Sequence, residues 1–277
     1  MKCGLVNLKK IKKHTMKKII LILVIAVTVL QITGCEKVGL RLTEYSLPSD
    51  KAYVKIALFS PNTPSVMIKA NDAKLNGATT SGSGGFFPAT STFPDFAAVA
   101  PGATIKLSLP NLGTQNDSVV LFTGQLGLNA NKFYSVTLAD TGINRTVFSI
   151  EDNYLPQIDS FLSVRLINAT VGASLNFIRI DSLNATDVVR DTLARNIPYK
   201  GTSGFVSVKT FGRSPVSSFI RLRVVTSAGV PIAGSVTPPQ TLATGSRRSV
   251  TVYTTGFANG TAAPFLPTMF STAITNQ

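Results

Sequence analysis

The sequence has no tryptophan, a single histidine and two cysteines. His14 and Cys3 both lie in the first 34 residues, a segment that we expect to be removed from the mature protein. A Ser-His-Asp triad, a Cys-His pair and a histidine-containing zinc site are therefore excluded. One cysteine is left, so no disulfide can form within the mature chain. We expect no enzyme activity, no cofactor and no metal site.

Acidic residues are also scarce, 13 against 27 lysines and arginines. Seven of these lysines precede Cys35 and no acid does, so the rest of the chain has a net charge of about +7. The basic excess falls after Gln157, whereas the segment from Glu36 to Pro156 is balanced. This pattern favours an anionic partner for the second half. The alternative is a set of solvated strand faces without a partner.

No hydrophobic run is long enough to cross a membrane. The run Ile19–Ile32 is shorter than the roughly 20 residues that a spanning helix needs. Lys17 and Lys18 precede it, and Thr33-Gly34-Cys35 follows it. A basic start, an apolar run and small residues before a cut are typical of a signal peptide.

This segment resembles the lipobox of bacterial lipoproteins, in which the cysteine after the cut carries the lipid. The resemblance implies a signal peptide over residues 1–34, with Met16 as an alternative start, and lipidation of Cys35. The alternatives are a transmembrane anchor and a plain secretory signal cut after Gly34. Glu36 is not the aspartate associated with inner-membrane retention in enteric bacteria, so we expect an outer-membrane lipoprotein. Whether it faces the cell surface or the periplasm stays open.

Short β-rich runs separated by Gly, Pro, Asn and Ser follow a tether over residues 35–50. Such spacing predicts an all-β fold with two tandem immunoglobulin-like β-sandwich domains after the lipoprotein signal peptide. The expected strands are 52–58, 65–69, 104–109, 118–122, 133–138, 162–167, 174–180, 204–209, 219–225 and 249–254.

The two halves look like repeats of each other. Residues 54–61 align with residues 164–171, and residues 128–136 align with residues 242–250. A repeat of about 110 residues suits a self-contained domain rather than a solenoid unit. The predicted domains are residues 51–153 and residues 157–277.

The second half resembles the domain-of-unknown-function 4397 family of bacterial envelope lipoproteins, found especially in the Bacteroidota. The matching segments are Val164–Thr170, Leu175–Asp181, Tyr199–Gly204 and Leu242–Val252. The first half departs from the pattern, because Leu58-Phe59-Ser60 replaces its Asn-Ala core. The resemblance implies an immunoglobulin-like sandwich in the cell envelope and brings no assigned activity.

Three sequence triplets resemble the Asp-Ser/Thr-apolar signal for O-glycosylation of Bacteroidota envelope proteins. They place the acceptor hydroxyls at Ser118, Ser182 and Thr192. Chance in a chain of this composition gives about one such triplet.

Arginines suggest a contact for phosphate or carboxylate groups. Arg221 and Arg223 fall on one face of a predicted strand, and Arg213, Arg247 and Arg248 could join them if the strands pair. Nucleic acid is not an expected partner of an exported chain without interleaved aromatic residues. Sugars could instead stack on Tyr199, Tyr253 or phenylalanines.

Two further segments have alternative interpretations. The glycine-rich stretch 77–85 precedes Phe86, Phe87, Phe93 and Phe96. Either these residues belong to a mobile contact loop, or Phe87, Phe93 and Phe96 form the core of a strand pair, and we favour the second. Glu151 and Asp152, with Asp140, either bind calcium between the domains or are solvated linker acids, and we favour the second.

The sequence thus favours a non-enzymatic envelope protein, held to the membrane by its lipid, that acts as a surface interaction or glycan-contact module. The alternative is a structural or accessory subunit that packs against an outer-membrane partner complex.

Overall fold

The computed structural model describes residues 47–277 except 90–94, 112–115, 156–160, 181–188, 210–218, 233–239, 244–247, 262–266 and 276–277. The predicted signal peptide and Cys35 lie outside these residues, as do Ser182, Phe93, Arg213 and Arg247. Among the described residues, no helix is long and apolar enough to span a membrane.

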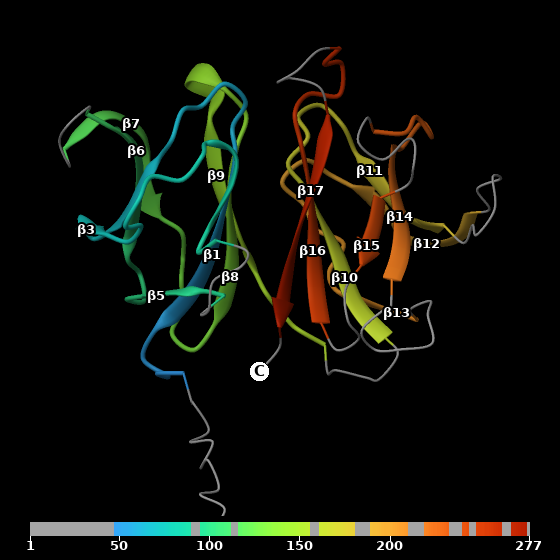
Figure 1. The fold of residues 1–277 in the computed structure, drawn as a ribbon, viewed down its shortest axis with the longest axis horizontal. Coiled ribbons are helices and arrows are strands. Elements are labelled where there is room, and N and C mark those ends of the chain that lie inside the picture. Colours follow the sequence, from blue (N-terminus) through green and yellow to red (C-terminus); the bar gives the residue numbers. More distant parts are fainter. Residues whose placement is uncertain are drawn as a thin grey trace, which may run out of the picture. The chain divides into compact units, whose positions relative to one another are not determined.

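The first half of the described chain is a sandwich of two sheets (Figure 1). One sheet has the order β4-β1-β8-β9, with β5 also paired to β1, and the other has the order β3-β2-β6-β7. The strands are β1 (Ala52–Phe59), β2 (Met67–Ala70), β3 (Ala73–Lys74), β4 (Ser83–Phe87), β5 (Ala97–Val99), β6 (Thr104–Pro110), β7 (Asp117–Gln125), β8 (Phe133–Ala139) and β9 (Thr146–Glu151). A 3-10 turn, η1 (Gly142–Asn144), connects β8 to β9. Side chains such as Ile56, Ile68 and Val136 fill the space between the sheets.

The second half repeats this arrangement with sheets β13-β10-β16-β17 and β12-β11-β14-β15. The strands are β10 (Phe161–Asn168), β11 (Leu175–Ile180), β12 (Val189–Ile197), β13 (Val206–Lys209), β14 (Phe219–Thr226), β15 (Gln240–Ala243), β16 (Arg248–Thr255) and β17 (Thr268–Thr275). Leu166, Phe177, Leu222 and Val252 are fully buried in its own core.

The first strand of each half lies next to a parallel partner. β1 pairs with β8 and β10 pairs with β16. The pairing also aligns the two halves more accurately than the sequence did: Lys55 lies opposite Ser135, and Arg165 lies opposite Thr251. Ser135 therefore corresponds to Thr251, two residues further along than in our sequence alignment.

The two sandwiches contact each other through the outer faces of the sheets that contain these parallel pairs. Alternate residues of a strand point to opposite faces, and all eight residues of β1 are buried. Its inward residues enter the first core, while Ala57 and Phe59 pack against Ile167 and Tyr253 of the second half. A strand covered on both faces reads as a continuous apolar run, as most of Ala52–Phe59 does.

The all-β prediction is confirmed, and every predicted strand has a counterpart in the structure. The last strand of the first half ends at Glu151, and β10 begins at Phe161. The predicted domain boundaries between them stay a prediction.

For the glycine-rich stretch, the favoured prediction of a strand pair with Phe87 in its core is confirmed, and the alternative of a mobile contact loop was wrong. Residues Ser83–Phe87 form β4, which pairs with β1. A Cβ atom on Gly84 would lie 3.1 Å from the Phe270 ring of the second half. Phe87 packs on the first core, and Phe86 joins Phe59 and Tyr253 between the sandwiches. Glycine here permits close approach rather than mobility.

Candidate functional site

The strongest electrostatic feature is a buried ion pair between the two sandwiches. The Nη2 atom of Arg165 in β10 lies 2.6 Å from Oδ1 of Asp152, and both side chains are almost inaccessible to solvent. The Arg165 Nε donates a hydrogen bond to Thr251, and its guanidinium lies 4.4 Å from the centre of the Phe205 ring. Our expectation of a solvated linker acid was therefore wrong for Asp152, because Arg165 compensates its buried charge.

Hydroxyl groups complete this buried cluster. Ser135 accepts hydrogen bonds from Arg165 at 2.6 Å and from the Tyr253 hydroxyl at 3.2 Å, and donates one to Asp152. Tyr154 also donates to Asp152. Burial raises the pKa of Tyr253 to about 12 and raises that of Tyr154 well above its ordinary value. Tyr253 is fully buried and Tyr154 is half-buried, and the hydrogen bond from Tyr253 to Ser135 joins the two halves.

Lys55 lies in the same layer, at the position of β1 that corresponds to Arg165 in β10. Its side chain is fully buried, and its Nζ has no hydrogen-bond partner among the described residues. Burial lowers the pKa of Lys55, while the charge of Asp95 acts in the opposite direction. The two copies of the repeat thus both place a cation between the sandwiches: Arg165 is paired with Asp152, and Lys55 interacts with the charge of Asp95.

The loops at one end of the two sandwiches form a second candidate site, which we call the loop end. β1, β8, β10 and β16 all finish there, and Thr255 at the end of β16 donates a hydrogen bond to the Phe59 carbonyl at the end of β1. Ile143, in η1, is fully exposed at 101%. A single exposed apolar residue is common on protein surfaces. Ile143 therefore suggests a contact site only if its loop is held in a fixed conformation.

Hydrogen bonds fix the loop that presents Ile143. Nε of Arg145 donates to the hydroxyls of Ser60 at 3.0 Å and Thr63 at 3.2 Å, and its Nη1 donates to the Gly142 carbonyl. On the other side of Ile143, the Thr141 hydroxyl donates to the Pro61 carbonyl. The exposed side chain therefore sits on a loop that is tied on both sides to the β1–β2 connection.

The second half contributes Val230 to the loop end. Val230 is 60% exposed at the tip of a hairpin after β14, closed by a 2.7 Å bond from the Thr226 N–H to the Val230 carbonyl. Gly229, with φ of 84°, supplies the left-handed residue that this turn requires. Val230, Ile232 and Ala258 line a small open pocket of about 150 Å³ beside the hairpin.

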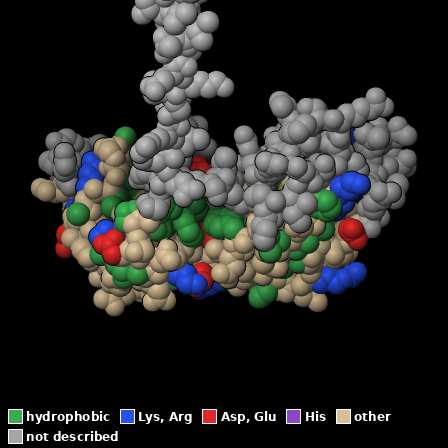
Figure 2. Space-filling model, turned by 90° about the horizontal axis from the view of Figure 1, so that it is seen from below, with side chains coloured by type: hydrophobic (Ala, Val, Ile, Leu, Met, Phe, Trp, Pro, Cys, Tyr) green, Lys and Arg blue, Asp and Glu red, His purple; other side chains and the backbone are tan. Residues whose placement is uncertain are grey.

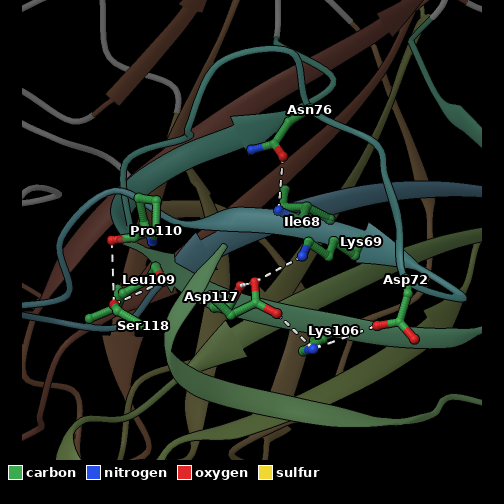
Figure 3. A network of polar contacts seen from close by, with 10 residues as sticks. Ile68, Lys69, Asp72, Asn76, Lys106, Leu109, Pro110, Asp117 and Ser118 are labelled. Atoms are coloured by element: carbon green, nitrogen blue, oxygen red, sulfur yellow. Dashed lines mark hydrogen bonds and ion pairs between the residues drawn. The ribbon is translucent and has the colours of Figure 1, made fainter. Parts of the chain in front are cut away.

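The third candidate site is a polar cluster on the outer side of the first sandwich, at the start of β7 (Figure 3). Asp117 contacts Nζ of Lys69 at 3.1 Å and Nζ of Lys106 at 2.7 Å, and accepts a hydrogen bond from Ser108. Lys106 also contacts Asp72 at 3.5 Å. The hydrogen bonds from Lys106 and Ser108 hold the pKa of Asp117 far below its ordinary value.

The Asp117 cluster predicts an acid-dependent loss of stability. A carboxyl group with a lowered pKa in the folded state stabilises the protein above its unfolded pKa of about 4 and loses this contribution as the pH falls below that value. We expect Asp117→Asn to cost about 1–2 kcal/mol at pH 7 and to flatten the dependence of stability on pH below 4. Urea unfolding between pH 2 and 7 measures both effects, and parallel curves for the two proteins would contradict them.

The predicted modification sites are only partly described. Ser118 is exposed on β7, and its hydroxyl donates to the carbonyls of Leu109 and Pro110 (Figure 3). Thr192 is half-buried on β12. Glycosylation of Ser118, Ser182 and Thr192 stays a prediction, as does lipidation of Cys35.

The structure brings together some of the predicted anion-contact arginines. Arg221 and Arg223 lie on β14 in the sheet β12-β11-β14-β15, whereas Arg248 begins β16 in the other sheet of that half. The sheet pairing therefore does not join Arg248 to the other two. Figure 2 shows basic side chains beside acidic ones on the face that it draws, rather than a single basic surface. Anion contact by Arg221, Arg223, Arg247 and Arg248 stays a prediction.

The two tyrosines named as possible sugar contacts have different environments. Tyr253 is fully buried between the sandwiches, so the prediction that it stacks on sugars was wrong. Tyr199 is half-buried, with Nζ of Lys200 5.3 Å from its ring centre. No group of three potential metal ligands occurs among the described residues. Glu151 is instead paired with Lys132 at 2.8 Å.

Sequence reasoning missed Arg165 and Ile143. Arg165 interrupts an apolar run, Leu162–Ile167, at the place where Lys55 interrupts the equivalent run. A cation at the same position of both repeats was a signal for a buried polar layer. Ile143 had no comparable signal, because an apolar residue in a turn has no periodic pattern.

Comparisons with known proteins do not assign the chain to a family. No protein-family model and no curated protein matches the sequence. The solved structures it is similar to include a candidate cell adhesion protein from Bacteroides uniformis, with 7% identity, 83% of this chain and 99% of that chain covered, and a TM-score of 0.23. A candidate cell adhesion protein from Bacteroides eggerthii has 8% identity, 82% and 97% coverage, and a TM-score of 0.21. Similarity this low carries no argument about function, and membership of the domain-of-unknown-function 4397 family stays a prediction.

Proposed function

We propose that the protein is a non-enzymatic, lipid-anchored protein of the outer membrane that binds a protein partner through its loop end. The observation that carries this proposal is the fixed loop that fully exposes Ile143. A pre-organised loop loses little conformational entropy when it binds, and an exposed apolar side chain gains by burial. Val230 offers a second apolar contact at the same end.

The length of β1 separates the loop end from the point at which the chain enters the first sandwich. The described chain enters β1 at Ala52, at the end of the sheet opposite to the loop end. The eight residues of β1 rise by roughly 26 Å at the usual spacing of a strand. The loop end is therefore about one strand length away from the residue at which the chain enters the first sandwich.

A protein is favoured over a glycan as the partner. The large apolar side chains that are exposed among the described residues are Val119, Val120, Ile143 and Val230, and none is aromatic. Sugars are commonly bound by stacking on aromatic rings, whereas aliphatic side chains suit an apolar pocket in a protein.

Protease treatment of intact cells that express the full chain tests the location. We expect the two sandwiches to be digested from outside. Protection until the cells are lysed would contradict a surface role and favour an accessory subunit in the periplasm.

Replacing Ile143 tests the contact. We expect Ile143→Ser to weaken adhesion of the cells to their partner surface by about 10-fold, because one central apolar contact is worth more than 1 kcal/mol. The melting temperature should not change, since the side chain is exposed. Asn144→Ser, an exposed neighbour in the same turn, is the matched control. Equal adhesion of the two variants would exclude Ile143 from the contact.

A further inference from the structure

The loop end contains an open pocket beside the hairpin that follows β14. The described residues that line this pocket carry no charge, and the apolar ones include Ala173, Val230, Pro231, Ile232, Ala258 and Pro267. An apolar cavity of about 150 Å³ can hold one benzene molecule, whereas pockets for small-molecule ligands usually have volumes of about 300 Å³ or more. The volume of this pocket, about 150 Å³, therefore suits a single uncharged side chain of roughly the size of leucine.

Asn168 connects the wall of this pocket to a neighbouring turn. Its amide nitrogen donates to the Ala173 carbonyl, and its amide oxygen accepts a bond from the Thr170 N–H. Ala173 and Thr170 both line the pocket. The backbone carbonyl of Asn168 accepts a 2.8 Å bond from the Lys200 N–H. The pocket wall is thus held in place before binding, which lowers the entropy that a partner must overcome, and Lys200 belongs to a turn fixed to the same residue.

The charges of the loop end favour an acidic partner. Lys200 is exposed, with its Nζ 5.3 Å from the Tyr199 ring centre. Among the described residues, neither Lys200 nor Arg145 forms an ion pair with a carboxylate. Asp140 lies between β8 and η1, and its carboxylate accepts a bond from the Thr141 N–H. These side chains together carry an excess of positive charge, and interfaces pair surfaces of opposite potential.

We propose that the protein partner inserts one uncharged aliphatic side chain into this pocket and places an acidic residue beside it, against Lys200. The aliphatic side chain gains by leaving water, and the carboxylate pairs with the exposed ammonium group. A charged side chain in the pocket would lose its hydration without gaining a partner. The inference rests on the proposed function, because it names the chemistry of the partner that the loop end binds.

Peptide titrations of the full-length protein in detergent test the proposal. The probes are N-acetyl-aspartyl-leucine amide, N-acetyl-aspartyl-lysine amide and N-acetyl-lysyl-leucine amide. The measurement is the NMR shift of the methyl groups of Ala173 and Ala258, which both line the pocket. We expect the first peptide to bind about tenfold more tightly than the second, because only the first buries an apolar side chain. It should bind several-fold more tightly than the third, since exposed ion pairs contribute less.

Variants of the full chain separate the two parts of the contact. Ala258→Leu fills the pocket and should abolish the shift of the Ala173 methyl group, and Val230→Ser, at the exposed hairpin, should weaken binding several-fold. Lys200→Ser should remove the preference for the aspartyl over the lysyl peptide. Lys74→Ser changes another exposed lysine, in β3, and is the matched control. Resistance to limited proteolysis should match the wild type in every variant.

Three results would overturn the inference. The first is equal binding of the three peptides, and the second is binding that folded Ala258→Leu and Val230→Ser leave unchanged. The third is a shift that grows with protein concentration without peptide, because a second copy would then occupy the pocket.

The inference and the proposed function can fail separately. Ile143 does not line the pocket, so Ile143→Ser should leave peptide binding intact. Adhesion that does not depend on Ile143, together with selective peptide binding, would overturn the proposed function alone. Adhesion that depends on Ile143, without selective peptide binding, would overturn this inference alone.

Discussion

Replacing Arg165 with methionine is expected to lower the free energy of unfolding by about 3–5 kcal/mol. The change leaves the Asp152 carboxylate buried between the sandwiches without its cation, and removing one partner of a buried ion pair typically costs this much. It also removes the hydrogen bonds that the hydroxyls of Ser135 and Thr251 accept from Arg165. Urea unfolding at pH 7 measures the loss.

Two companion variants separate charge burial from a simple loss of contact. Lys132→Met breaks the neighbouring Lys132–Glu151 pair, whose side chains are 51% and 36% exposed, and should cost less than about 1 kcal/mol. The double change Arg165→Met and Asp152→Asn should be more stable than Arg165→Met alone, because no unpaired charge remains. A loss below about 1 kcal/mol for Arg165→Met would show that the ion pair does not hold the halves together.

Replacing Asn168 with alanine is expected to cost about 2–4 kcal/mol. Asn168 is fully buried at the end of β10, and its amide nitrogen donates to the carbonyls of Ala173 and Ile197 at 2.8 and 3.0 Å. Its oxygen accepts from the Thr170 N–H and the Thr254 hydroxyl. Alanine leaves all four partners without these bonds, and an unsatisfied buried polar group costs about 1–3 kcal/mol.

Asn176→Ala provides the comparison for this prediction. Asn176 is half-buried, and its amide makes a 3.5 Å bond to Thr226 and accepts one from the Asn196 N–H. Its replacement should cost about 1 kcal/mol, since water can reach the groups that are released. Equal losses for the two asparagines, measured by urea unfolding, would contradict the role given to Asn168.

Strands in which apolar and polar residues alternate were predicted from the sequence. Strands that form because of contacts with a distant segment were missed. Residues 104–109 and 133–138 were found because one face of each meets the core. For residues 77–85 a flexible loop stayed an alternative to a strand pair, because glycines suggest mobility unless the ring of Phe270 beside Gly84 is known. That contact joins residues about 190 positions apart, and no local pattern reports it.

Prediction of the candidate sites was weaker for the same reason. The acids at 151 and 152 look equivalent in sequence, yet Glu151 faces solvent beside Lys132 and Asp152 is buried against Arg165. Similarly, Arg221 and Arg248 fall in different sheets because strands 219–226 and 248–255 belong to opposite layers of the sandwich. Composition indicates how many charges a half contains, and the packing of the sheets decides which of them meet.

The parallel pairs at the centre of each half determine the order in which the chain can fold. β1 must wait for β8, about 80 residues later, and β10 must wait for β16, about 86 residues later. A chain that is synthesised or threaded across a membrane from its N-terminus therefore leaves Ala52–Phe59 without its central partner until most of the first half has emerged. Completion of each sandwich is a late, non-local event, which favours slow folding.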